Sequence, residues 1–359
     1  MPALTGIRVP LALWVVVHHI SGPGRMLDPV TAASPALYAL IDAAWVALSA
    51  FFAISGFVLA RRYRNTVWSR DALARFAAAR FGRIYPVYFL SLLILLPIIA
   101  EAMRQDELGS PAERAGLLLN YVLLLQGWHW PSVSWNTPAW SLSCEVFFYA
   151  CAPIVVLLVR VTSWPRVLAT AGLACALPIG MRLLIDPPIP KALLYFGDFL
   201  IGVAAAGLYE HCRSRGARLH RVGPWVYGPA FAGGIALLLS RDALGSFLVF
   251  DSGVRIVSAL LVFGLACGGG WLVRALSSPI ALAGGRASYA IYILHIPVLW
   301  WFERWRFDAA LPPVYAGMVY VLVVVVLSLV VSRWYEGPAN EIVRRWCAGR
   351  RRAPAVRFA

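Results

Sequence analysis

The feature that most constrains this chain is a series of long apolar runs separated by short polar connections. An α-helix needs about 20 apolar residues to cross the hydrocarbon core of a bilayer, so each run of about 17 to 21 residues predicts one transmembrane helix. The runs lie near residues 6–22, 40–60, 83–100, 140–160, 166–184, 191–209, 222–240, 253–273, 286–303 and 313–333. The expected fold is all-α: a polytopic integral membrane protein of about ten transmembrane helices. One transmembrane domain is expected over residues 1–340, followed by a basic tail over residues 341–359.

The composition agrees with a membrane protein and excludes a soluble globular chain. Hydrophobic residues make up 60% of the 359 residues and charged residues only 14%. The six cysteines lie mostly inside apolar runs and lack the spacing of metal ligands. We therefore expect small buried cysteine side chains and no metal site.

The net charge of +15 raises the question of a nucleic-acid partner, but the arginines are spread over alternate connections. They gather in residues 61–83, 213–221 and 344–357, whereas the intervening connections carry most of the acids, such as Glu101 and Asp308. Such alternation follows the positive-inside rule. It predicts that the basic segments and both termini face the cytoplasm, in a multi-pass protein of the inner (plasma) membrane, with no nucleic-acid partner.

One short apolar run, Ala115–Leu125, affects this topology. If it crossed the membrane, residues 210–221 and the tail would face away from residues 61–83. The arginine pattern therefore predicts that residues 115–139 form a re-entrant or interfacial segment.

The first span, Leu4–Ile20, carries two ionisable residues, Arg8 and His19. They are eleven positions apart, which on a helix is about three turns plus roughly 20°, with a rise of roughly 16 Å. The two side chains are therefore expected on one face at different depths. Ionisable groups within a membrane are candidates for function. The alternative is that Arg8 anchors the span at one surface and His19 lies near the other.

A second pair of cations, Arg80 and Arg83, lies three positions apart and so on one helix face. Ser69 is a plausible N-cap of a helix at the inner surface, which would precede the third span. Two neighbouring guanidinium groups at the mouth of a cavity suit a multiply anionic ligand. Attraction to anionic lipid headgroups is an equally good interpretation.

The fourth span begins near Pro138 and carries Ser141, Glu145 and Tyr149, which repeat every four residues and share a face. Glu145 is the acid that we expect to be hardest to accommodate, because the helix around it is apolar. It should face a cavity or a partner, with an ion pair to Arg8 as the structural alternative.

Aromatic and polar residues flank these charges. Trp128, Trp130, Trp135 and Trp140 predict either an interfacial belt or a surface on which sugars stack. Ser55 and Gly56 in the second span indicate close helix packing. In the ninth span, Ser288, Tyr292 and His295 form one polar stripe, which could equally be a set of structural hydrogen bonds between helices.

Five stretches together resemble the acyltransferase 3 family of membrane-bound O-acyltransferases. They are LTGIRVPLALWVVVHH, FFAISGF, RFGRIYP, WSLSCEVFFY and SYAIYILHIPV, in the family's order and over most of the chain. The family's Arg-x10-His pair falls on Arg8 and His19, and its Arg-x-x-Arg pair on Arg80 and Arg83. Its Trp-Ser-Leu-x-x-Glu element falls on Trp140, Ser141, Leu142 and Glu145. Thr5 and Ser49 stand where the family often has acids, so no role of those acids is carried over. The resemblance is to the stand-alone form, without an extracytoplasmic hydrolase-like domain.

The resemblance implies acyl transfer from cytoplasmic acyl-CoA, with acetyl-CoA as the default donor, to a hydroxyl of a glycan or a lipid-linked sugar. His19 would be the general base, for which an imidazole with an ordinary pKa near 6.5 is suited. Arg80 and Arg83 would hold the CoA phosphates. Arg8 would orient the acyl arm or stabilise negative charge, and Glu145 would orient an imidazole or balance Arg8. The acceptor side would comprise Trp140, Ser141, Tyr149, Tyr292 and His295.

Other functions remain open on the sequence. The acceptor could be a small molecule such as a macrolide. A glycan or lipid transporter would also need intramembrane charges, although two related halves with broken helices would be expected there. A binding or sensor protein would not need a base near a phosphate-binding pair.

Overall fold

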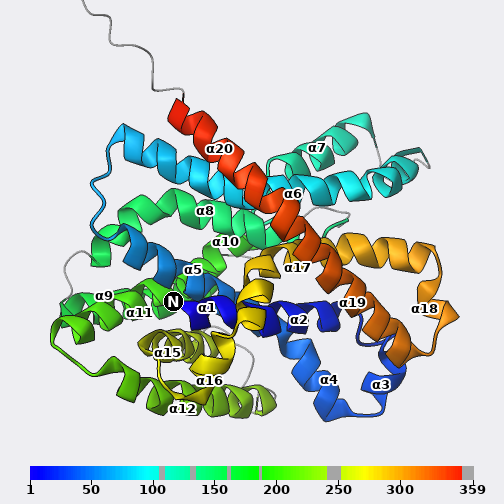
Figure 1. The fold of residues 1–359 in the computed structure, drawn as a ribbon. Coiled ribbons are helices and arrows are strands. Elements are labelled where there is room, and N and C mark those ends of the chain that lie inside the picture. The colour runs from blue at the N-terminus through cyan, green and yellow to red at the C-terminus, as the bar shows by residue number, and fades with distance from the viewer. Residues whose placement is uncertain (105–109, 130–134, 160–162, 186–187, 241–251, 350–359) are drawn as a thin grey trace, which may run out of the picture.

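The computed structural model describes residues 1–104, 110–129, 135–159, 163–185, 188–240 and 252–349, and every regular element among them is helical (Figure 1). In the first half these are α1 (Pro2–Gly6), α2 (Arg8–His19), α3 (Asp28–Ala32), α4 (Pro35–Asp42), η1 (Ala43–Trp45), α5 (Val46–Tyr63), α6 (Arg70–Arg104), α7 (Pro111–Val122), α8 (Ala139–Val155) and η2 (Val156–Val159). In the second half they are α9 (Trp164–Leu184), α10 (Lys191–Leu194), α11 (Phe196–Ser214), α12 (Leu219–Leu239), α15 (Val254–Cys267), α16 (Gly270–Leu276), α17 (Pro279–Arg304), α18 (Phe307–Ala310), α19 (Pro313–Val331), η4 (Ser332–Glu336) and α20 (Gly337–Gly349).

The prediction of an all-α polytopic membrane protein is confirmed. Six described helices are long and apolar enough to cross a membrane, and the bent pair α15–α16 raises the number to seven. The expected number of ten spans is therefore not confirmed. Three of the expected spans lack a helix that is both long and apolar enough: α2 has only 12 residues, α8 has 17, and α17 has 26 residues but is not apolar enough along its length.

Helix α6 differs from the expectation of a surface helix followed by a separate span. Residues Arg70–Arg104 form one helix of 35 residues. At 1.5 Å per residue this is about 52 Å, well beyond the roughly 30 Å of a hydrocarbon core. The sequence contains no turn signal between Ser69 and Tyr85, so the helix continues, and Pro86 and Pro97 are accommodated within it. The expected surface helix and the expected third span are thus two parts of the single helix α6.

The direction of α8 relative to α6 indicates whether the segment around α7, which lies between them in the chain, crosses the membrane. The Ser91 hydroxyl of α6 lies 3.0 Å from Nδ2 of Asn136, just before α8, whereas Phe76 of α6 packs on Tyr149, farther along α8. Helices α6 and α8 therefore run antiparallel, as expected when no net crossing lies between them. Helix α7 is only 12 residues long, about 18 Å, which fits the predicted absence of a full crossing at residues 115–125. Trp130 of the expected aromatic belt lies outside the described residues.

Helices α5 and α11 pack closely at glycines. A Cβ atom at Gly56 would lie 2.1 Å from the carbonyl oxygen of Phe199, and one at Gly202 would lie 2.0 Å from the carbonyl oxygen of Ala53. No side chain fits at either position without moving a backbone. The prediction that Gly56 allows close helix approach is confirmed.

Replacing Gly56 by alanine is therefore expected to lower the free energy of unfolding by about 1–3 kcal/mol, because the added methyl group must push α5 and α11 apart. Thermal unfolding of the detergent-solubilised protein measures the loss. Gly233→Ala is the matched control, since a Cβ there meets no atom within 4 Å. The control should be neutral or slightly stabilising. Equal melting temperatures for the two variants would contradict the packing argument.

The span expected at residues 253–273 is broken. Helices α15 and α16 meet at an angle of 85°. Gly268, Gly269 and Gly270 all have positive φ, between +78° and +85°, and a Cβ at Gly269 would lie 2.0 Å from the carbonyl oxygen of His220. Only glycine adopts such a run readily. The three glycines thus explain why one apolar run becomes two helices.

A buried ion pair joins α11 to α15. Arg255 Nη2 lies 3.3 Å from Asp198 Oδ2, and the two side chains are only 3% and 1% exposed. Glu210 and Glu336 are also buried, whereas Glu145 is half-buried. The expectation about Glu145 stays a prediction. Asp198 is the most deeply buried acid in the described chain, and it is paired with an arginine 57 positions away.

The C-terminal helices close one side of the bundle. Figure 1 shows α19, η4 and α20 as one nearly continuous rod that crosses over α6. At the crossing, a Cβ on Gly82 would lie 2.9 Å from Oδ1 of Asn340 and 3.3 Å from Cβ of Val343. Helix α20 therefore runs through the boundary expected at residues 340 and 341. Residues 350–359 of the expected tail lie outside the described residues.

Candidate active site

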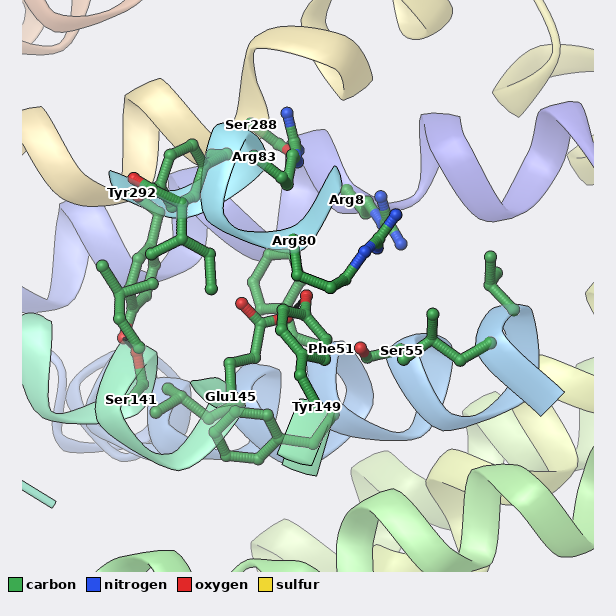
Figure 2. A pocket seen from close by; sticks show the side chains of 17 residues that line it. Arg8, Phe51, Ser55, Arg80, Arg83, Ser141, Glu145, Tyr149, Ser288 and Tyr292 are labelled. Carbon is green, nitrogen blue, oxygen red and sulfur yellow. Dashed lines mark hydrogen bonds between the residues drawn. The ribbon is translucent and has the colours of Figure 1, made fainter. Parts of the chain in front are cut away.

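A cavity of about 180 Å³ lies where α2, α5, α6, α8 and α17 converge (Figure 2). Its polar lining brings together seven of the residues predicted from the sequence, and they come from four of the five stretches of the resemblance. They are Arg8, Arg80, Arg83, Ser141, Glu145, Tyr149 and Tyr292. Ser55, Ser288 and Tyr289 complete the polar wall.

Three arginines give the cavity its positive charge. Figure 2 shows the side chains of Arg8 and Arg80 reaching toward one another from α2 and α6. Neither has a carboxylate within 4 Å in the part of the chain that the structure describes, and the Nε atom of Arg80 is buried without a hydrogen-bond partner. The Arg80 guanidinium lies over the rings of Phe76 and Tyr149. Like charges brought together in a buried site favour binding of an anion between them.

Arg83 differs from its neighbours because it has an acidic partner. Its Nη1 atom donates to Oε1 of Glu336, a buried carboxylate in the π-helical turn η4. The guanidinium also lies 5.1 Å from the ring centroid of Tyr289. Sequence reasoning missed Glu336, which lies in a C-terminal segment where arginines outnumber acids. An acid shortly after the last apolar run was the signal available, and its partner lies 253 positions earlier.

Glu145 lines the cavity but does not pair with Arg8. Its Oε1 atom accepts a hydrogen bond of 2.9 Å from the hydroxyl of Tyr149, one turn later on α8. No ion pair within 4 Å joins it to any described arginine. The carboxylate therefore faces the cavity among three cations, as expected for a site residue.

Ser141 and Tyr292 join α8 to α17. The Ser141 hydroxyl lies 2.8 Å from the carbonyl oxygen of Pro138 and 2.9 Å from the hydroxyl of Tyr292. Trp140, in contrast, does not line this cavity. Its indole ring packs under the ammonium of Lys191, at 4.3 Å, and beside Tyr195.

The two predicted imidazoles form a pair. His295 Nε2 lies 3.3 Å from His19 Nδ1. His19 Nδ1 also lies 2.9 Å from the carbonyl oxygen of Val15, and His295 Nδ1 lies 2.7 Å from that of Tyr292. A carbonyl oxygen only accepts, so each neutral ring carries its hydrogen on Nδ1. The lone pair of His19 is then on Nε2, and His295 orients the ring from the other nitrogen.

The imidazole pair and the arginine cavity lie at different depths along the same two helices. Helix α2 packs on α17 in parallel: Val9 meets Gly284 and His19 meets His295. His19 contacts His295 of α17, and Arg8 lines the arginine cavity together with Ser288 and Tyr292 of α17. His19 and His295 do not line the cavity, which ends at Phe51 and Tyr292. The rings of Tyr292 and His295 are 6.1 Å apart, so one aromatic side chain separates the two parts of the site.

The fold and the buried charges define a polytopic membrane protein with a polar site inside its helical bundle. Comparison with known families is more specific, because the family model described as an acyltransferase domain matches residues 1–333. The chain belongs to this family, the acyltransferase 3 family, as its motifs predicted.

Individual relatives are more distant. Acyltransferase MdmB of Streptomyces mycarofaciens is 28% identical over 323 residues, which cover 83% of this chain and 79% of that protein. A Staphylococcus aureus protein, SAS0844, whose name gives O-acetyltransferase as a provisional assignment, is 19% identical over 373 residues. The match covers 94% of this chain but only 57% of the staphylococcal protein. No solved structure matches the chain significantly.

Proposed function

We propose that the protein is a membrane O-acyltransferase that moves an acyl group, most simply acetyl, from cytoplasmic acyl-CoA to a hydroxyl of a glycan or lipid-linked sugar. The observation that carries this proposal is the placement of three arginines around one cavity, one aromatic layer away from an imidazole with an available lone pair. Membership of an acyltransferase family supports the reaction class.

Acyl-CoA matches the cavity in charge. Its pyrophosphate carries negative charges that Arg80 and Arg83 would bind, with Arg8 beside them. The pantetheine arm would then extend along α2 and α17 toward His19, a rise of about 16 Å along α2. The thioester has to pass Tyr292 to reach the imidazole pair.

The reaction is a substitution at the thioester carbonyl. The acceptor hydroxyl attacks the carbonyl carbon while His19 Nε2 takes the hydroxyl proton. A C–O bond forms, the C–S bond breaks, and the CoA thiolate leaves and takes up the proton. His295 keeps the His19 ring in the tautomer that this requires. Arg8 would orient the acyl arm or stabilise the negative charge of the neighbouring pyrophosphate.

The acceptor would meet the His19 end of the bundle. Of the residues expected on the acceptor side, Tyr292 and His295 would contact it there. Ser141 and Tyr149 line the arginine cavity instead, and Trp140 packs on Lys191, so the proposal gives these three no contact with the acceptor. The name of the staphylococcal relative supports an acetyl group and an oxygen acceptor. The distribution of arginines supports an inner-membrane location with both termini in the cytoplasm.

Release of free CoA from acetyl-CoA by the purified, detergent-solubilised protein tests the proposal. Arg80→Gln is expected to raise the KM for acetyl-CoA about tenfold, the usual cost of losing a charge-assisted hydrogen bond. Arg75→Gln is the matched control, because Arg75 lies on the same helix but is exposed and outside the cavity. Wild-type protein that neither binds nor consumes acetyl-CoA would contradict the proposal and favour a transporter.

A further inference from the structure

A second cavity, of about 390 Å³, adjoins the arginine cavity at its outer end, and the donor mechanism does not use it. We call it the outer cavity and define it by its described lining residues: Met1, Leu4, Thr5, Arg8, Phe57, Val58, Arg61 and Arg62. Arg8 and Val58 line both cavities, so the two adjoin at these side chains. A ligand longer than the inner cavity would extend into the outer one.

The outer cavity is cationic. Arg8, Arg61 and Arg62 line it, and its described lining contains no Asp or Glu. Arg61 is partly neutralised, since its Nε atom donates to Glu210 Oε1 at 2.8 Å and its guanidinium lies over Tyr209. Arg62 is exposed and makes no hydrogen bond or ion pair with the described chain; it lies only near the ring of Tyr63. Its five donors are therefore available to a ligand.

The order of charges in CoA follows the order of the two cavities. From the thioester outward, CoA carries the uncharged pantetheine arm, the pyrophosphate and then a ribose with a separate 3′-phosphate. With the arm directed toward His19 and the pyrophosphate at Arg8, Arg80 and Arg83, the nucleotide end falls at the outer cavity. We propose that the outer cavity is a subsite for the 3′-phosphate of the acyl-CoA donor, with Arg62 as the main binding residue.

This inference rests on the proposed acyl-CoA donor, and it predicts in addition that the protein distinguishes CoA from 3′-dephospho-CoA. A protein that binds only the pyrophosphate would treat CoA and 3′-dephospho-CoA alike. One with a 3′-phosphate subsite would prefer CoA, because an arginine binds a dianionic phosphate through paired, charge-assisted hydrogen bonds. Arg62 is the better residue to change than Arg61, whose ion pair with Glu210 also joins α5 to α11.

The test is calorimetric titration of the full-length, detergent-solubilised protein with CoA and with 3′-dephospho-CoA. The wild type is expected to bind CoA about tenfold more tightly than 3′-dephospho-CoA. Arg62→Gln should lose that preference by weakening CoA binding alone. Arg215→Gln is the matched control, because Arg215 is exposed just after α11 and lines neither cavity. It should keep the wild-type preference.

Two results would overturn the subsite: equal affinities of the wild type for both ligands, or an Arg62→Gln protein that retains the preference for CoA. The second result is also what binding of lipid headgroups by Arg62 would produce. Unchanged affinity of Arg62→Gln for 3′-dephospho-CoA shows that the variant is folded. The titration does not depend on turnover. CoA preference without consumption of acetyl-CoA would therefore contradict the proposed reaction while leaving the subsite in place.

Discussion

Replacing His19 by alanine is expected to lower acetyl transfer by about 10²- to 10⁴-fold, the usual contribution of a general base. The reason is the hydrogen-bond pattern around the ring: Nδ1 is engaged by Val15 and His295, which leaves Nε2 to take the proton of the acceptor hydroxyl. The binding of acetyl-CoA should change little, because His19 does not line the arginine cavity. Steady-state release of CoA and direct binding of acetyl-CoA measure the two effects separately.

His220→Ala is the control for this measurement, because His220 is exposed and lies outside the cavities described above. It should transfer acetyl groups at the wild-type rate. A His19→Ala protein that retains full turnover would remove His19 as the base. If the His19→Ala protein loses its affinity for acetyl-CoA by the same factor as its turnover, His19 belongs to the donor site instead.

Replacing Asp198 by alanine is expected to lower the free energy of unfolding by about 3–5 kcal/mol, because it leaves the Arg255 charge buried without its carboxylate. This is the largest stability effect that the structure leads us to expect from a single side chain. The pair lies outside the described lining of the arginine cavity, so the variant should lose thermal stability before it loses its affinity for acetyl-CoA. Thermal unfolding in detergent measures the effect.

Glu341→Ala provides the comparison. Glu341 pairs with Arg345 at 2.7 Å, but the two side chains are 52% and 79% exposed. Losing such a surface pair costs at most about 0.5 kcal/mol. The double variant Asp198→Leu/Arg255→Met should recover much of the loss, since apolar side chains can replace a buried pair. A single Asp198→Ala variant as stable as Glu341→Ala would show that Asp198 contributes nothing through this pair.

Sequence patterns predicted the local parts of the fold and site. Helical periodicity placed Arg8 and His19 on one face, and the three-residue spacing of Arg80 and Arg83 put both into one cavity. These features follow from the regular geometry of a single helix. A resemblance in several separate stretches then indicated which helices converge, which periodicity alone does not show.

What the sequence did not predict depends on contacts between distant segments. Glu336 pairs with Arg83 because the rod of α19, η4 and α20 crosses α6, and no local pattern encodes that crossing. Asp198 was overlooked for the same reason, since its partner is on another helix. The bend between α15 and α16 could have been predicted, because three consecutive glycines end an apolar helix.

The aromatic layer formed by Phe51 and Tyr292 has a consequence for what can cross the bundle. Their ring centroids lie 6.1 Å apart at the end of the arginine cavity. Each hydroxyl moved into apolar surroundings without a partner costs roughly 2–7 kcal/mol, so a sugar with several hydroxyls meets a high barrier there. An acetyl thioester presents one weakly polar carbonyl. Under the proposed function, the layer therefore acts as a polarity filter that admits the acyl group and keeps the sugar on the His19 side. The same barrier would hinder leakage of water and ions through the bundle.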